Sequence, residues 1–304
     1  MPKTEGLLML SIGQAKITFW GVRGSIPTPG QDTVGVGGNT SCVEIRADGE
    51  HIILDAGSGL RPLGRALTKE FGARPLAMTV LITHTHWDHI QGFPFFVPAY
   101  IPENSVRILG YEGARNDLQA TLAGQMESPY FPIALAQMPG NIVIEELKSL
   151  DFKIGPIVGK ACHVNHPGVC VGYRLNTSAG SICYIPDHES GPESHDGPAS
   201  IEGAMEESVI DFIRDADVVI MDAQYTATEY KKHVGWGHGC LDDVVRVALR
   251  GNVKQLFLFH HDPSHDDEFL AEMLAHAQSL TKGTSLRVSL AREGESVVLA
   301  PVKK

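Results

Sequence analysis

An apolar segment runs directly into a cluster of histidines, and this junction limits the possible folds more than any other feature. Residues 76–83 read LAMTVLIT and residues 84–89 read HTHWDH. The apolar run predicts a buried strand, so the histidines stand where the chain leaves a sheet. Residues two apart on an extended chain point the same way, which directs His84 and His86 toward one ion. A helical turn expected at DHIQG then directs Asp88 and His89 toward a second position.

The whole HxHxDH pattern favours a metal site over a chance cluster. A lone histidine here is more often an exposed loop residue, and a lone aspartate is more often a helix cap. With about one chance in twenty at each specified residue, however, the full pattern arises by chance in roughly two of a thousand chains of this length. The segment therefore predicts ligands for two metal ions.

The rest of the chain predicts many short strands with single helices between them. Strands are expected at 15–20, 42–47, 51–56, 76–83, 105–110, 141–146, 157–164, 169–175, 181–185, 217–222, 254–259 and 286–290. Helices are expected at 59–71, 113–126, 202–214, 240–250 and 266–280. Helices that arrive singly favour two stacked sheets with helices outside. No repeat or linker divides the chain, so we expect one domain over residues 1–304.

Charge and cysteine content disfavour several classes of protein. The formal net charge is −11, and no run of basic residues offers a patch for a phosphate backbone, so long nucleic acids are disfavoured as partners. The five cysteines are scattered and never form a CxxC pair, which suits a reducing compartment and buried thiols. No segment approaches the roughly 18 apolar residues of a membrane span, and the N-terminus lacks the apolar core of a signal peptide. We therefore expect a cytoplasmic protein without a membrane partner.

Three residues near the ends of later strands complete two binding positions. His166 lies in HVNHPG, where the chain turns between two strands, whereas its rival His163 lies within the strand and is expected to pack. Asp187 follows the strand at 181–185, where its two oxygens can bridge two ions. His260 follows QLFLF directly. Catalytic zinc sites usually have three protein ligands and one open position. Together with the HTHWDH segment, these residues can supply three ligands to each of two ions.

This order of motifs resembles the metallo-β-lactamase fold hydrolases from about residue 15 to the C-terminus. Within that superfamily the sequence is most similar to the phosphodiesterase branch, which includes tRNase Z and the phosphoribosyl cyclic phosphodiesterases. The resemblance implies an α/β fold, a four-layer αββα sandwich of two mixed β-sheets, with a two-metal site at the edge of the sheets. It implies that one ion is held by His84, His86 and His166, and the other by Asp88, His89 and His260.

The same resemblance implies that Asp187 bridges the two ions. ILDAGSG at 53–59 is similar to the family's early Asp-x-Gly turn, and we expect Asp55 to orient the ligands from behind. The ligand set fits two divalent ions, Zn²⁺ in the first place, and is also compatible with Mn²⁺ or iron.

A second motif, MDAQYTATEYKKHVGWGHGC at 221–240, narrows the branch. In tRNase Z-like enzymes a strand ends in an acidic residue, and a later Gly-His motif supplies a catalytic histidine that binds no metal; Asp222 and His238 match these roles. A phosphodiester oxygen that leaves as an alkoxide needs a proton, and a histidine held by a carboxylate delivers one near neutral pH. Gly239 stands where the family usually has Ser or Thr, which weakens the helix cap and not the proton donor. The alternative makes His238 a plain neighbour of the helix that follows.

Together these residues predict a dinuclear metal-dependent hydrolase that activates water toward phosphorus, with His238 as general acid. tRNA-processing relatives carry an arm between the third histidine motif and the bridging aspartate, whereas only 20 residues separate His166 from Asp187. With the acidic charge, this favours a small phosphodiester, such as a cyclic nucleotide or a related cyclic phosphodiester. The alternative is a metal-dependent carbonyl hydrolase acting on a lactone or thioester, which has no need of the Asp222 and His238 pair. A non-catalytic sensor is disfavoured because every ligand position is filled.

Several features stay open in the sequence. The polar segment 186–203 is expected to be a surface loop, either a lid over the site or an inert insertion. Four aromatic residues flank the metal motif and either form an apolar wall for a base or pack in the core: Trp87, Phe93, Phe95 and Phe96. Whether His261 and His265 touch the site is undecided. A homodimer is expected by analogy with the relatives alone.

Overall fold

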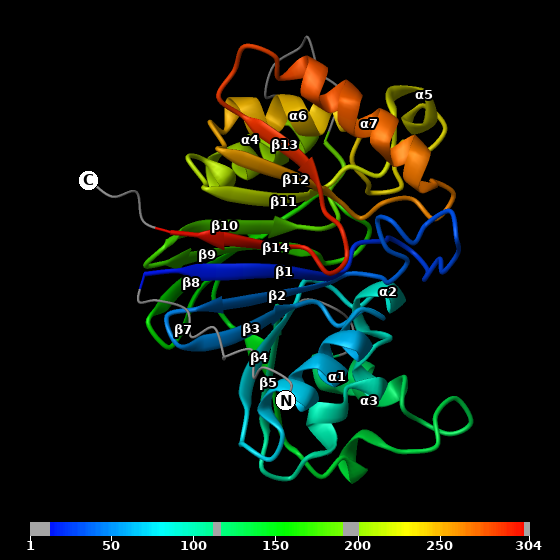
Figure 1. Cartoon of the computed structure of the whole chain (residues 1–304), viewed down its shortest axis with the longest axis vertical. Coiled ribbons are helices and arrows are strands. Elements are labelled where there is room, and N and C mark those ends of the chain that lie inside the picture. Colours follow the sequence, from blue (N-terminus) through cyan, green and yellow to red (C-terminus); the bar gives the residue numbers. More distant parts are fainter. Residues whose placement is uncertain (1–12, 112–116, 191–200, 301–304) are drawn as a thin grey trace, which may run out of the picture.

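Two seven-stranded β-sheets form the body of the protein (Figure 1). The structure is a computed structural model that describes residues 13–111, 117–190 and 201–300, except for the side chains of residues 201 and 202. The first sheet has the strand order β14 (Ser296–Leu299), β1 (Ala15–Gly21), β2 (Cys42–Ala47), β3 (Glu50–Leu54), β4 (Ala77–Ile82), β5 (Ser105–Tyr111) and β6 (Asn141–Leu147). The second has the order β13 (Arg287–Leu290), β12 (Gln255–Phe259), β11 (Val218–Asp222), β10 (Gly180–Ile185), β9 (Val171–Thr177), β8 (Ile157–His163) and β7 (Asp151–Ile154).

Each sheet is mixed, with an antiparallel part and a parallel part. In the first sheet β14, β1, β2 and β3 pair antiparallel, and β3 to β6 pair parallel. In the second sheet β7 to β10 pair antiparallel, and β10 to β13 pair parallel. The two sheets therefore have the same arrangement of strands. In each sheet, the carboxyl ends of several parallel strands lie on the same side.

Helices cover the outer face of each sheet, which completes four layers (Figure 1). The α-helices are α1 (Leu60–Phe71), α2 (Trp87–Ile90), α3 (Leu118–Gly124), α4 (Ile201–Ile213), α5 (Ala227–Tyr230), α6 (Leu241–Arg250) and α7 (Asp267–Leu280). Short 3₁₀ turns are η1 (Phe93–Phe95), η2 (Val97–Tyr100) and η3 (Leu135–Gln137). α1 and α3 pack on the first sheet, whereas α4, α6 and α7 pack on the second.

Apolar spacing explains why these segments fold as they do. Helix α6 buries Leu241, Val244, Val245 and Ala248, an i, i+3, i+4, i+7 stripe that faces β11. Between the sheets, Phe19 of β1 meets Phe257 of β12, with ring centroids 5.1 Å apart. The core is therefore continuous from one sheet to the other.

The predicted αββα sandwich of two mixed sheets is confirmed. Each expected strand is present within about two residues of its predicted bounds, and so are the helices at 59–71, 202–214, 240–250 and 266–280. Two short edge strands, β7 and β14, were not predicted. The helix expected at 113–126 is shorter in the described part, Leu118–Gly124, and residues 112–116 lie outside it.

One prediction about the loops is wrong in part. Segment 186–203 was expected to lie on the surface, but Asp187, His188, Glu189 and Ser190 are buried, and α4 begins at Ile201. Two of these side chains find partners elsewhere in the chain, because Glu189 accepts from the backbone nitrogens of Gly235 and Gly237, and His188 Nδ1 accepts from the backbone nitrogen of Asn165. Residues 191–200, on which the lid prediction depends, lie outside the described ranges.

Candidate metal centre

The predicted ligands follow the ends of strands, along one edge of the two sheets. β4 ends at Ile82, and the HTHWDH segment starts two residues later. Asp187 stands two residues after β10, and His260 directly follows β12. Parallel strands in a sheet point their carboxyl ends to the same side, so residues far apart in the sequence meet there.

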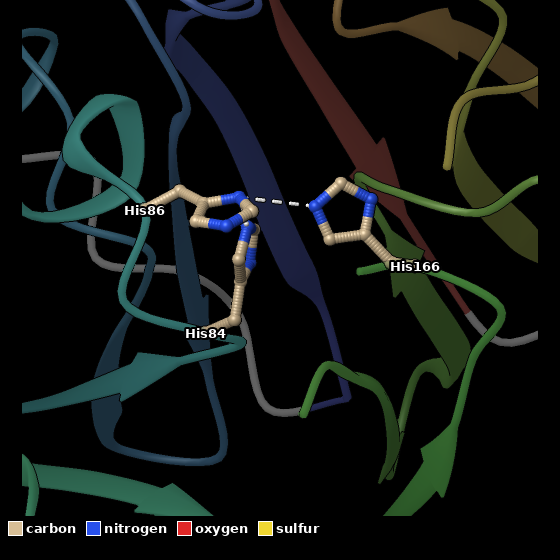
Figure 2. A group of neighbouring side chains, drawn as sticks. All are labelled: His84, His86 and His166. Carbon is tan, nitrogen blue, oxygen red and sulfur yellow. Dashed lines mark hydrogen bonds between the residues drawn. The ribbon is translucent and has the colours of Figure 1, made fainter. Parts of the chain in front are cut away.

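Three of the predicted histidines converge from two segments. The ring nitrogens His84 Nε2 and His86 Nδ1 lie 2.9 Å apart, and His86 Nδ1 lies 3.0 Å from His166 Nε2. Figure 2 shows His84 and His86 on the loop between β4 and α2, with His166 facing them from the loop between β8 and β9. His84 and His166 are buried, whereas His86 is exposed, so this group is open to solvent on one side.

A second group lies beside the first and is fully buried. Asp88 Oδ2 lies 3.2 Å from His89 Nε2 and 3.1 Å from His260 Nε2. The side chain of Asp187 faces both groups, because its Oδ1 lies 3.4 Å from His260 Nε2 and 3.9 Å from His166 Nε2. The structure thus brings all seven predicted ligands together, with Asp187 between the two groups.

Two unpartnered atoms in this cluster fit a cation better than a packed core. His89 Nε2 and Asp187 Oδ2 lie 3.0 Å apart, both are buried, and neither has a hydrogen-bond partner among the described residues. Buried polar atoms are rarely left without a partner. Within each group of three or four side chains, the ligand atoms lie within 4.8 Å of one another. Imidazole nitrogens and carboxylate oxygens together suit zinc, manganese or iron, so the donor set fits the expected divalent ions.

Protonation also favours metal binding by the first group. Burial lowers the pKa of His84, His86 and His166, which keeps these rings neutral at neutral pH. His166 Nδ1 donates to the carbonyl oxygen of Gly237 at 2.8 Å, and this bond leaves Nε2 as the nitrogen with a lone pair. A neutral imidazole with a free lone pair is the form that ligates metals.

Asp55 supports the second group from behind. Its carboxylate accepts hydrogen bonds from His89 Nδ1 at 2.8 Å, from the Tyr184 hydroxyl at 2.9 Å and from the Thr83 backbone at 2.8 Å. With its proton held on Nδ1, His89 presents Nε2 to the cluster. This is the outer position that the sequence predicted for Asp55.

The predicted catalytic pair lies at the rim of the cluster. His238 Nδ1 donates to Asp222 Oδ2 at 3.0 Å and lies 3.5 Å from Asp187 Oδ1. Burial lowers the pKa of His238, but the Asp222 carboxylate outweighs burial and raises that pKa to about 9. The N-cap of α6 is Cys240, two residues after His238. Asp222 and His238 are also near enough to Asp187 and His260 to share an ion with them, a second assignment that the geometry allows.

Two supporting residues went unnoticed in the sequence. Gln224 Oε1 accepts from His260 Nδ1 at 3.0 Å and so orients that ring. The buried Glu189 carboxylate accepts from the backbone nitrogens of Gly235 at 2.7 Å and Gly237 at 2.8 Å. Each of the two stands two residues after a nominated aspartate near a strand end, at the same spacing as His84 and His86. Period-two spacing could have drawn attention to both positions, but not to the distant backbone partners of Glu189.

The histidines left open lie outside the cluster. His261 Nε2 donates to the carbonyl oxygen of Ala291 at 3.2 Å, and His265 Nε2 meets Glu229 Oε1 at 2.8 Å. His163, the rival of His166, packs edge to face against Tyr111, with ring centroids 4.8 Å apart. None of the three belongs to a group of potential metal ligands among the described residues.

The aromatic residues around the metal motif divide into two pairs. Phe93 and Phe96 are fully buried in the core beneath α1. Trp87 and Phe95 are 74% and 52% exposed, so core packing does not account for them.

Comparison with known proteins agrees with the fold and the motifs. Residues 50–261 match the model of a family described as the beta-lactamase superfamily domain. Ribonuclease Z of Geobacillus kaustophilus (strain HTA426) is 24% identical over 252 residues, which span 70% of this chain and 79% of that protein.

Solved structures give the same result for the fold. The metallo-beta-lactamase fold protein YhfI from Bacillus subtilis superimposes with a TM-score of 0.67 at 18% identity, over 94% of this chain and 99% of that one. The short form of human tRNase Z superimposes with a TM-score of 0.61 at 19% identity, over 94% and 100%. The family match spans more than half of the length of this chain. The chain therefore belongs to the beta-lactamase superfamily, and it has the metallo-β-lactamase fold that its sequence motifs predicted.

Proposed function

We propose that this protein is a dinuclear metal-dependent hydrolase that cleaves a small phosphodiester, a cyclic nucleotide or a related cyclic phosphodiester. The observation that carries the proposal is the pair formed by His238 and Asp222 at 3.0 Å, on the rim of a cluster of seven potential ligands. The pair is not expected in the carbonyl hydrolases that share this fold, so it supports phosphorus as the reacting centre.

The ligand roles follow the two groups. One ion would be held by His84, His86 and His166, the other by Asp88, His89 and His260, with Asp187 in contact with both. Bound there, two divalent ions would lower the pKa of a water molecule and offset the charge of the phosphate oxygens.

His238 would supply the proton for the leaving oxygen. With a pKa raised to about 9 by Asp222, its ring is charged at neutral pH. Because Nδ1 is held by Asp222, the proton on Nε2 is the one available to a leaving alkoxide. Asp222 is itself fixed, since it is buried and its Oδ1 accepts from the Gln224 backbone at 3.0 Å.

Three observations support the proposed substrate, one of them for a phosphodiester and two for a small molecule. Ribonuclease Z, the name of the curated relatives, denotes a ribonuclease, and ribonucleases cut phosphodiesters. Between His166 and Asp187 the chain forms only the β9–β10 hairpin, which leaves no room for an inserted arm that could grip an RNA. The net charge of −11 also disfavours a long polyanion.

A substrate panel tests the proposal. The protein reconstituted with zinc or with manganese is assayed against bis(p-nitrophenyl) phosphate, 2′,3′- and 3′,5′-cyclic nucleotides, a precursor tRNA, a lactone, a thioester and a β-lactam. Metal-dependent cleavage confined to the small diesters is the expected result. Preferred cleavage of the precursor tRNA would refute the small substrate, and preferred cleavage of the carbonyl compounds would refute the phosphodiesterase assignment.

The role of His238 has its own test. His238→Ala is expected to keep two equivalents of metal and to lose most turnover, whereas His276→Ala, an exposed histidine on α7, should keep both. Loss of metal together with activity would instead assign His238 to the ligand set, the second assignment that the geometry allows.

The proposal includes a resident metal, a compartment and an assembly. Zinc is proposed as the native ion, with manganese or iron as alternatives that elemental analysis of the purified protein distinguishes. A cytoplasmic location agrees with the five free, buried cysteines. In the described ranges, no helix is long and apolar enough to span a membrane. A homodimer is proposed by analogy and is checked by sedimentation.

A further inference from the structure

An apolar pocket of about 490 Å³ is lined in part by the segment that carries the proposed metal ligands. Its wall starts within the metal motif itself, because Thr85 and Trp87 line it and flank His86 in the sequence. Phe95 of η1, and Tyr130 and Phe131 beyond α3, also line it. A molecule seated in the pocket would therefore lie against the segment that also carries His84, His86 and His89.

The rings around this pocket are exposed to an unusual degree. Trp87 is 74% exposed, Tyr130 is 80% exposed and Phe95 is 52% exposed. Phe95 is also held in place by an edge-to-face contact with Phe131, with ring centroids 5.4 Å apart at 87°. Several large aromatic side chains kept at one surface pocket are typical of a binding site and not of a folding core.

The chemistry of the wall indicates a flat, uncharged ligand. None of the eleven residues that line the pocket in the described part of the chain is charged, so the pocket itself offers nothing to a phosphate. The side-chain amides of Gln91 and Gln125 also line the pocket. Gln91 Nε2 donates to Thr40 Oγ1 at 3.1 Å, and Gln125 Nε2 donates to the carbonyl oxygen of Ile90 at 3.2 Å. Each amide oxygen is then left as an acceptor for a donor on the edge of a ring.

We infer that this pocket binds the nucleobase of the substrate while the phosphodiester lies at the metal centre. The inference rests on the proposed function and makes it more specific, because it selects nucleoside phosphodiesters among the small diesters. The two parts of such a molecule differ in charge. Its anionic diester is attracted to metal cations, whereas its planar, uncharged base stacks on aromatic rings. Stacking on aromatic side chains contributes a comparable free energy for every base, so the pocket selects for a base without selecting one base strictly.

Adenosine, which carries a base and no phosphate, tests the pocket without any turnover. Its binding to the zinc-loaded protein is measured by ligand-observed NMR for the native chain, Phe95→Ala and Tyr130→Ala. Both side chains are largely exposed, so the variants should fold, and each is expected to bind adenosine about tenfold more weakly. Leu280→Ala, which removes a 40% exposed side chain from α7, should bind like the native protein. Absence of adenosine binding, or equal binding by the native and both aromatic variants, would overturn the inference.

Turnover separates this inference from the proposed function. Adenosine 2′,3′-cyclic phosphate and ribose 2′,3′-cyclic phosphate share the diester and differ in the base. Native protein is expected to prefer the nucleotide about tenfold in kcat/KM, and Phe95→Ala is expected to lose most of that preference. If neither compound is cleaved but adenosine still binds to the aromatic pocket, the proposed function fails and the pocket assignment stands. If both are cleaved equally by native protein and variant, the function stands and the nucleobase site is refuted.

Discussion

Replacement of Glu189 by glutamine is expected to open the loop at residues 235–238 while the rest of the protein stays folded. Glu189 is 6% exposed, and its two oxygens accept from the backbone nitrogens of Gly235 and Gly237 and from the Tyr230 hydroxyl at 2.7 Å. This loop holds two parts of the candidate site, since the Gly237 carbonyl orients His166 and the next residue is the proposed acid. One buried carboxylate thus positions both a proposed ligand and the proposed proton donor.

The size of the effect follows from the hydrogen bonds. Glutamine keeps one acceptor oxygen and turns an amide toward the other backbone N–H, so one charge-assisted bond is lost and one buried donor is left unpaired. A bond of this kind contributes roughly 1.5–3 kcal/mol. With about 2 kcal/mol lost locally, loop opening should rise roughly thirtyfold. Global stability is typically about 5–15 kcal/mol, so the fold should survive.

Amide hydrogen exchange measures this opening directly. In Glu189→Gln, exchange at residues 235–238 should accelerate roughly thirtyfold, and kcat should fall at least about tenfold because His238 leaves its position. Glu207→Gln is the matched control, since Glu207 is half-exposed on α4 and pairs with Arg250. Unchanged exchange in the loop, or faster exchange throughout the protein, would refute a local positioning role.

Three further perturbations test other parts of the site and fold. Asp222→Asn removes the carboxylate that raises the pKa of His238, so the alkaline limb of the kcat profile should move to lower pH; a limb that stays in place excludes His238 as the acid. Asp55→Asn should weaken metal binding about 10–100-fold in chelator competition, because a support behind the ligands is lost; unchanged affinity contradicts that role. Burial raises the pKa of Glu44, but its hydrogen bond from His51 and nearby positive charge outweigh burial and lower the pKa from 4.5 to about 2. A carboxyl group whose pKa is lower in the folded protein stabilises the fold above its unfolded pKa, and this stabilisation is lost as the pH falls toward its folded pKa. The free energy of unfolding, measured with urea, should therefore fall by roughly 3 kcal/mol between about pH 5 and pH 2. In Glu44→Gln this decrease should be absent.

Much of the candidate metal centre could be predicted because its residues stand near strand ends. The strand at 77–82 is a continuous apolar run, and the position where it stops fixes which of the following histidines share a side. Asp187 and His260 are predicted in the same way, because each follows an apolar run, which ends at Ile185 in one case and at Phe259 in the other. Apolar patterning therefore places the ligands along the sequence, and the common direction of parallel strands brings them together.

The role of Glu189 could not be predicted in this way. Its partners Gly235 and Gly237 lie 46 and 48 residues away, and no sequence pattern pairs a carboxylate with a distant backbone N–H. Composition gave the opposite expectation, because a polar segment rich in glycine and proline is usually exposed. Glu189 can be buried because its charge is matched by backbone donors, which composition does not record.

Two glycines show how the early Asp-x-Gly turn and the histidine motif depend on each other. A Cβ on Gly57 would lie 2.2 Å from the Asp88 carbonyl oxygen, and one on Gly92 would lie 1.9 Å from the Gly57 carbonyl oxygen. The Ala56 backbone donates to the His89 carbonyl at 2.8 Å and accepts from the Gly92 backbone at 2.8 Å, so the two segments lie against each other without room for side chains. Asp55, held at φ 59°, can then reach His89 from behind. Gly92 and Gly57 are thus required for one steric reason. The segment that carries the proposed ligands and the segment that orients them are in close backbone contact, which leaves no space for a Cβ at either position.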